Sequence, residues 1–84
     1  MTDFFEFYDR LRRSFPMHLE IYQSKIMDWH IEIKIIGCAG DYPTAEHEGN
    51  DVLVVWVQHS DMKYCFAKAH VALKDWMMEY EGGY

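Results

Sequence analysis

The chain has 84 residues, of which half are hydrophobic and 17% aromatic, and it carries fourteen Asp and Glu against eight Lys and Arg. This length leaves room for one core, so residues 1–84 are expected to form a single domain, and the apolar content argues against intrinsic disorder. The formal net charge of −6 repels phosphate backbones and disfavours general nucleic-acid binding.

The first predicted helix occupies residues 3–15. Asp3 can cap it, and Glu6 three residues later closes an arrangement like a capping box. Spacing of three and four residues marks its buried face, which consists of Phe4, Tyr8, Leu11 and Phe15, widened by Phe5. Pro16 ends the helix because proline disfavours helical geometry in the residue before it.

Two segments with a period of two follow the helix. In residues 17–22, Leu19 and Ile21 alternate with polar residues and predict a short strand. After a predicted turn from Ser24 to Asp28, residues 29–35 show the clearest alternation of the chain, with isoleucines at 31, 33 and 35. Such a pattern is typical of a strand with one face in the core and the other in water.

Residues 37–51 are rich in Gly, Pro and Asn and predict a loop, which is long for so small a domain. The third predicted strand, residues 52–58, is apolar on both faces if it alternates strictly. Val52, Val54 and Trp56 then point one way, and Leu53, Val55 and Val57 point the other. Two arrangements fit this pattern: a central strand covered on both faces, or an edge strand that pairs with another chain.

A long helix is predicted from residue 62, capped by Ser60 or Asp61 and stopped by Gly82 and Gly83. Its apolar stripe consists of Met62, Cys65, Phe66, Ala69, Leu73, Trp76, Met77 and Tyr80. The elements together predict an α+β fold of order α-β-β-β-α, with a three-stranded antiparallel sheet and two helices packed mainly on one face.

No motif in the chain indicates catalysis or a cofactor. The serines occupy a helix end, a turn and a cap, and neither a nucleophile elbow nor a phosphate-binding glycine motif is present. A zinc site would have to draw on Cys38, His47, His59 and Cys65, which lack the close ligand pairs of structural zinc sites, so we expect no metal. Two separated cysteines and the absence of a long apolar run favour a reduced, cytoplasmic protein without a membrane span.

The loop is the first candidate binding segment because it concentrates carboxylates without a basic residue. Such a patch could dock a basic partner. Its candidate binding residues are Asp41, Tyr42, Glu46, His47, Glu48 and Asp51.

The element order, with the Ala-rich stretch Phe66-Ala-Lys-Ala-His-Val-Ala-Leu73, resembles double-stranded RNA-binding domains. That family grips phosphates with a lysine cluster at the start of its last helix. Here the corresponding stretch, residues 61–68, holds only Lys63 and Lys68 beside an acid, and the proline- and histidine-bearing loop between the first strands is missing.

The sequence therefore predicts a small acidic, non-enzymatic protein-interaction module, with a homodimer as a further expectation. The candidate interface residues are apolar positions of the third strand and of the outer side of the last helix: Leu53, Val55, Val57, Val71 and Met78. The alternative is a nucleic-acid-binding domain that uses Arg10, Arg12, Arg13 and the lysines of the last helix. A third hypothesis is a small metal-dependent enzyme.

Overall fold

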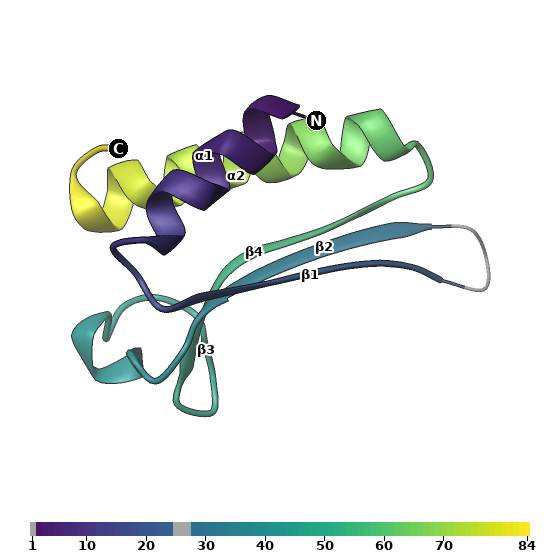
Figure 1. Ribbon diagram of the computed structural model, residues 1–84. Coiled ribbons are helices and arrows are strands. Elements are labelled where there is room, and N and C mark those ends of the chain that lie inside the picture. The colour runs from purple at the N-terminus through teal and green to yellow at the C-terminus, as the bar shows by residue number, and fades with distance from the viewer. Residues whose placement is uncertain (1, 25–27) are drawn as a thin grey trace.

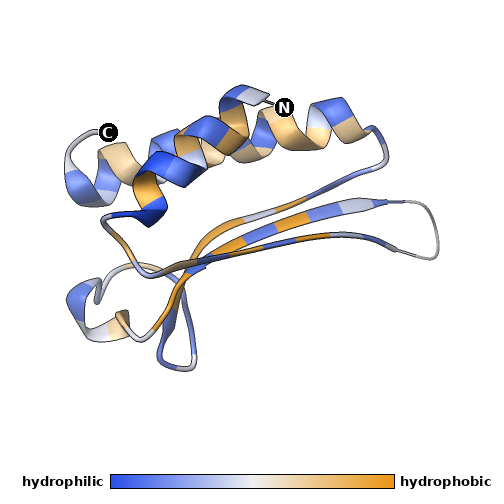
Figure 2. Ribbon diagram, viewed as in Figure 1, coloured by the Kyte–Doolittle hydropathy of each residue, from blue (hydrophilic) through white to orange (hydrophobic). Residues whose placement is uncertain are grey.

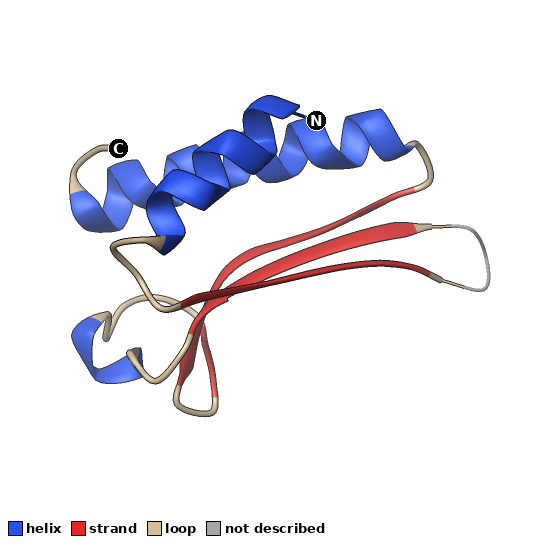
Figure 3. Ribbon diagram, in the orientation of Figure 1, coloured by secondary structure: helices blue, strands red, loops and turns tan. Residues whose placement is uncertain are grey.

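Two helices lie on one face of an antiparallel sheet in the computed structural model, which describes residues 2–24 and 28–84 (Figure 1). The α+β class and the approximate order of elements are confirmed. In chain order the elements are α1 (Thr2–Arg12), β1 (Met17–Gln23), β2 (Trp29–Ile35), the 3₁₀ turn η1 (Ala39–Asp41), β3 (His47–Glu48), β4 (Asp51–His59) and α2 (Met62–Glu81) (Figure 3).

The prediction of three strands is wrong, because the sheet has four in the order β1-β2-β4-β3. The additional strand β3 pairs His47 with Val52 and Glu48 with Asp51 inside the segment that was expected to be a loop. Gly49 adopts a left-handed φ of 65° in the tight turn between β3 and β4, a conformation that glycine adopts without steric cost. Two residues are too few to show a period of two, so no alternation marked this strand.

The two alternating segments form strands, as predicted, and these strands pair with each other. In β1 and β2, Leu19 lies opposite Ile33 and Ile21 opposite Ile31, and all three isoleucines of β2 are fully buried. The alternation of hydrophobic and hydrophilic residues along β2 is visible in Figure 2. Residues 25–27 of the predicted turn lie outside the described residues. At its ends, the amide of Ser24 donates to the Asp28 carbonyl over 2.8 Å.

A β-bulge in β4 changes which side chains reach the core. Lys34 of β2 lies opposite Leu53 and Ile33 lies opposite Val55, so Val54 is an extra residue on β4. Val52, Val54 and Val55 are all buried as a result, whereas the Trp56 side chain is 52% exposed. The predicted strict alternation is therefore wrong. The bulge gives β4 one buried face and one open face, not two apolar faces.

The core lies between the inner face of the sheet and the two helices. Asp61 caps α2 by accepting a 2.8 Å hydrogen bond from the Tyr64 amide, and Gly82 ends the helix with a left-handed φ of 75°, both as predicted. The buried residues of α2 are Cys65, Phe66, Ala69, Leu73, Trp76 and Met77, all from the predicted stripe.

The predicted face of α1 needs correction. The helix buries Phe4, Phe7 and Leu11, whereas Phe5 is 43% exposed and Tyr8 lies at the margin of the core. It begins at Thr2, which places Asp3 inside the first turn, and it ends at Arg12. A tight turn follows, in which the Leu11 carbonyl accepts hydrogen bonds from the amides of both Ser14 and Phe15. Among the residues that the structure describes, no helix combines the length and the apolarity that a bilayer crossing requires.

Candidate functional site

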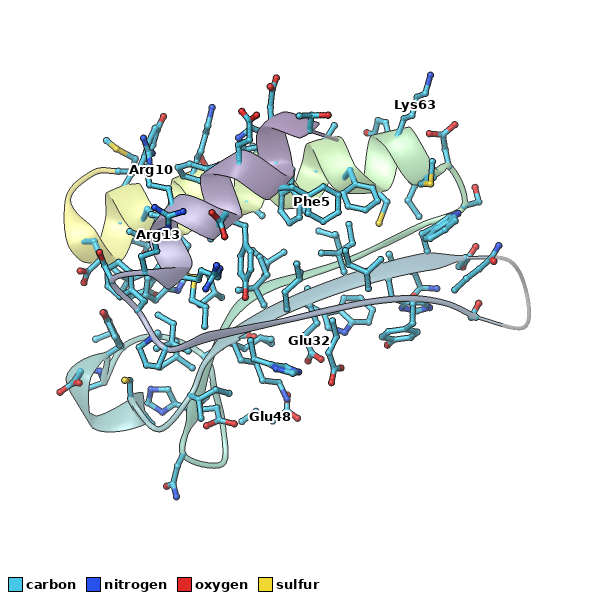
Figure 4. All side chains as sticks on the ribbon, viewed as in Figure 1. Phe5, Arg10, Arg13, Glu32, Glu48 and Lys63 are labelled. Carbon is cyan, nitrogen blue, oxygen red and sulfur yellow. The ribbon has the colours of Figure 1, made fainter. Side chains whose placement is uncertain are left out.

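The sheet face opposite the helices is not covered by either helix and is the first candidate surface. Figure 1 shows that α1 and α2 both lie on the other side of the sheet. Figure 4 shows Glu32 and Glu48 pointing away from the helices, on the opposite side of the sheet from Phe5 and Arg10. We call this surface the outer face and define it by the outward positions of the strands: His18, Glu20, Tyr22, His30, Glu32, Lys34, Glu48, Leu53, Trp56 and Gln58.

Three rings form a row across the outer face. The ring of Tyr22 in β1 stacks on the ring of His30 in β2, with centroids 4.5 Å apart and an interplanar angle of 7°. On the other side, the indole of Trp56 in β4 meets His30 edge-on at 5.9 Å and 69°. Tyr22 and Trp56 are 46% and 52% exposed, so this aromatic row presents ring surface to solvent.

Carboxylates surround the aromatic row. Glu20 and Glu32 lie directly opposite each other on β1 and β2, and side chains in that relation have Cβ atoms only about 5 Å apart. Like charges placed directly opposite are mutually destabilising. At the far end of the face, Asp28 accepts a 2.7 Å hydrogen bond from the Gln58 amide, which fixes a third carboxylate beside the rings.

One lysine offsets part of this negative charge. The Lys34 ammonium lies 3.0 Å from a carboxylate oxygen of Glu48 and 3.8 Å from one of Glu32. The hydrogen bond with Glu48 raises the pKa of Lys34, so this side chain stays protonated at neutral pH. Glu20 forms no ion pair with a Lys or Arg of the described chain, and its one such contact is with the imidazole of His18, at 3.2 Å. The half of the face around Glu20 is therefore the more negative half.

The predicted acidic loop is folded against the rest of the protein. Tyr42 packs on Trp76 and Tyr80 of α2 with ring centroids 5.1 and 6.4 Å away, and burial together with the nearby Glu81 raises its pKa to about 12. His47 contacts the Tyr42 carbonyl at 2.7 Å, and Asp51 accepts a 2.9 Å hydrogen bond from the Gly37 amide.

Tyr42, His47 and Asp51 thus hold the loop in place. The exposed carboxylates of the predicted set are Asp41, Glu46 and Glu48, of which Glu48 reaches the outer face through Lys34.

The predicted interface residues separate into four environments. Val55 is 2% exposed and belongs to the core, so it cannot contact a partner. Leu53 lies partly buried on the outer face, and Val57 lines a hollow beside α2 with Val71. Met78 is 57% exposed on the outer side of α2.

The four side chains considered for zinc do not form a site. Within residues 2–24 and 28–84 the structure brings together no group of three His, Cys, Asp or Glu that could hold a metal ion. Cys65 is fully buried, and its thiol donates to the Trp29 carbonyl over 3.4 Å. Burial raises the pKa of the Cys65 thiol, which makes it a poor nucleophile and a poor ligand.

The basic residues of the alternative hypothesis are held by three different partners. Arg12 and Arg13 both donate to Asp9, over 2.7 and 3.0 Å, while Arg10 lies over the Phe7 ring. Lys68 lies over the ring of Tyr64 on α2, whereas Lys74 of α2 lies over the same Phe7 ring as Arg10, 5.9 Å from its centroid. Comparison of the chain with protein-family models, with curated proteins and with solved structures gave no match.

Sequence reasoning missed the side chains that define the outer face. Glu20, Tyr22, His30, Glu32 and Trp56 were assigned to strands, but only as the polar alternates of each pattern or, for Trp56, as part of an apolar face. Their cross-strand register brings them together. That register, including the bulge that turns Trp56 outward, could be obtained only from the pairing of β1, β2 and β4.

Proposed function

We propose that this protein is a non-enzymatic interaction module that binds a basic segment of a partner protein through the outer face. The observation that carries the proposal is the opposed pair Glu20 and Glu32 beside the aromatic row. An arginine or lysine side chain seated between these carboxylates would offset their like-charge repulsion, of which Lys34, 3.8 Å from Glu32, offsets only part. A cationic ligand can lower the electrostatic energy of this pair, and an anionic ligand cannot.

The rings complement the same ligand. A guanidinium or ammonium within about 6 Å of an exposed Tyr or Trp ring is attracted by the ring quadrupole, and Tyr22 and Trp56 flank the carboxylates on the two sides of His30. Arginine suits the face best, because its planar fork can pair with a carboxylate while its flat surface stacks on a ring. Glu48 and Asp28 extend the negative charge toward the two ends of the sheet.

Aromatic rings on an open sheet can also stack nucleobases, so single-stranded nucleic acid is the competing ligand. Stacking proteins combine their rings with a positively charged groove for the phosphates. Among the described residues, the ring-bearing face carries four carboxylates, Glu20, Asp28, Glu32 and Glu48, against the ammonium of Lys34. The charge therefore favours the basic peptide.

The test is a titration of the full chain with a fluorescent hexa-arginine peptide, compared with a single-stranded oligonucleotide. Glu32→Gln removes one charge of the opposed pair without changing side-chain length, and we expect it to weaken peptide binding about tenfold. Tyr22→Ala removes the exposed stacking ring and should weaken binding about threefold. Peptide affinity should fall with rising salt.

The matched control is Glu6→Gln, which makes the same chemical change at an exposed position of α1, away from the outer face. It should leave the affinity unchanged. Equal affinities for Glu32→Gln and Glu6→Gln, or tighter binding of the oligonucleotide than of the peptide, would contradict the proposal.

A further inference from the structure

A second surface lies at the side of the molecule, between α2 and the free edge of β4. Strand β3 pairs only with Asp51 and Val52, and the Leu53 amide donates to the Glu46 carbonyl over 2.9 Å. From Val54 to His59, β4 has no strand beside it on this edge among the residues described. A hollow lies above this edge. We call it the edge groove, and six of the residues that line it are Val57, Ala67, Lys68, Val71, Ala72 and Asp75.

The edge groove is apolar at its centre and charged at its two ends. Val71 is 59% exposed, and the small side chain of Ala72 lies beside it in the groove. Lys68 and Asp75 flank this centre on the same face of α2, because residues seven apart lie two turns apart on one side of a helix. In the part of the chain that the structure describes, neither Lys68 nor Asp75 forms an ion pair.

We infer that the edge groove is occupied by a second copy of this chain, related by a two-fold axis that passes between Val71 and Ala72. In such a dimer the two α2 helices run antiparallel. Each residue of α2 then faces the partner residue that lies equally far from the axis, on its other side. Lys68 and Asp75 lie equally far from the axis, so Lys68 meets the partner's Asp75 and Asp75 meets the partner's Lys68. The charges of the groove are thus complementary to a rotated copy of themselves.

A second pair of side chains obeys nearly the same symmetry. Tyr64 and Met78 are 51% and 57% exposed and lie seven residues before and after Val71. Their midpoint differs from that of Lys68 and Asp75 by half a residue, which is less than about 1 Å along a helix. Tyr64 therefore contacts the partner's Met78, a sulfur-to-ring contact that favours association. Ala67 and Ala72 leave room for the close approach of about 8–10 Å that packed helices adopt.

The strands fit the same axis. Strand β4 leads into α2 through a short turn, so the two elements run in opposite directions, and α2 packs against β4 (Figure 1). An axis perpendicular to the sheet that makes the helices antiparallel also makes the two β4 edges antiparallel. Neighbouring strands lie about 4.8 Å apart, so β4 from residue 54 onward can pair with its copy beneath the helices and continue the sheet. This pairing would cover an edge that is otherwise an aggregation hazard.

The test is a charge-reversal series followed by sedimentation velocity across a concentration range. The wild type should be in a concentration-dependent monomer–dimer equilibrium. Lys68→Glu and Asp75→Lys each place like charges together twice in the dimer, and each should raise the dimer dissociation constant at least about tenfold. The double variant Lys68→Glu/Asp75→Lys restores opposite charges in exchanged positions. Its dissociation constant should return to within about threefold of the wild-type value.

Lys63→Glu is the matched control, because it makes the same charge reversal in the first turn of α2 at an exposed residue that does not line the groove. It should leave the dissociation constant unchanged, and circular dichroism of every variant should report an intact fold. A wild type that stays monomeric at high concentration would overturn the inference. So would a dimer that Lys68→Glu does not weaken, or one that the double variant does not restore.

Discussion

At the scale of single residues, His30 determines how the outer face is built. Its ring is the middle member of the aromatic row, and its Nδ1 atom is buried with no hydrogen-bond partner among the described residues. A buried polar atom that lacks a partner costs about 1–3 kcal/mol. The stacking of Tyr22 and the edge contact of Trp56 offset this cost. The histidine therefore acts chiefly as a flat ring that packs between the rings of Tyr22 and Trp56.

The substitution His30→Phe tests this role. Phenylalanine keeps a flat ring between Tyr22 and Trp56 and removes the unpartnered nitrogen, so the free energy of unfolding should stay the same or rise by up to about 1 kcal/mol. Urea denaturation measures the change. The control His18→Phe alters an exposed histidine of the same face and should change stability by less than about 0.5 kcal/mol. A loss of more than about 1 kcal/mol in His30→Phe would show that the nitrogen has a bonding role.

At the scale of the elements, the bulge at Val54 decides which residues of β4 are available to a partner. It places Val55 in the core at 2% exposure and its neighbour Trp56 in solvent at 52%. The two adjacent residues should therefore respond in opposite ways to the same substitution. Val55→Asp buries an unpaired charge and should cost more than about 3 kcal/mol, enough to unfold much of so small a domain. Trp56→Asp should cost only about 1 kcal/mol.

Thermal unfolding followed by circular dichroism measures both variants. A strand without the bulge, alternating strictly from Val52, would give the reverse order, with Val55→Asp tolerated and Trp56→Asp damaging. The pair of substitutions thus distinguishes the two registers of β4 without a further structure.

The helices and the three longer strands could be predicted because local signals defined them. Asp61 and Gly82 marked the two ends of α2. The isoleucines at every second position of β2 indicated that one face of this strand is buried. The two features that no local signal defined were β3 and the bulge, because each exists only through pairing with another strand. This limit affected the prediction of the candidate site more than the prediction of the fold. The acidic loop was identified by composition, whereas the opposed carboxylates Glu20 and Glu32 depend on the register of β1 and β2.

At the scale of the whole molecule, the two proposed surfaces lie on different sides of the protein and meet along β4, which carries Trp56 on the outer face. The helices cover one face of the sheet and leave the outer face open (Figure 1). The edge groove lies between α2 and β4. The two-fold axis proposed for the dimer is perpendicular to the sheet, so both outer faces of a dimer point in the same direction. One dimer would therefore present two basic-peptide sites side by side on a continuous sheet.

This arrangement predicts avidity for a bivalent ligand. Two hexa-arginine segments joined by a flexible Gly-Ser linker can engage both outer faces of one dimer, and the second contact then forms within the complex at a high effective concentration. Above the dimer dissociation constant, the wild type should bind the bivalent peptide at least about tenfold more tightly than the single segment. Lys68→Glu should bind the single segment as the wild type does but lose the gain in affinity for the bivalent peptide. Lys63→Glu should retain that gain.

An equal gain in wild type and Lys68→Glu would show that the two outer faces are not brought together through the edge groove. Loss of single-segment binding in Lys68→Glu would instead show that the groove and the outer face are coupled.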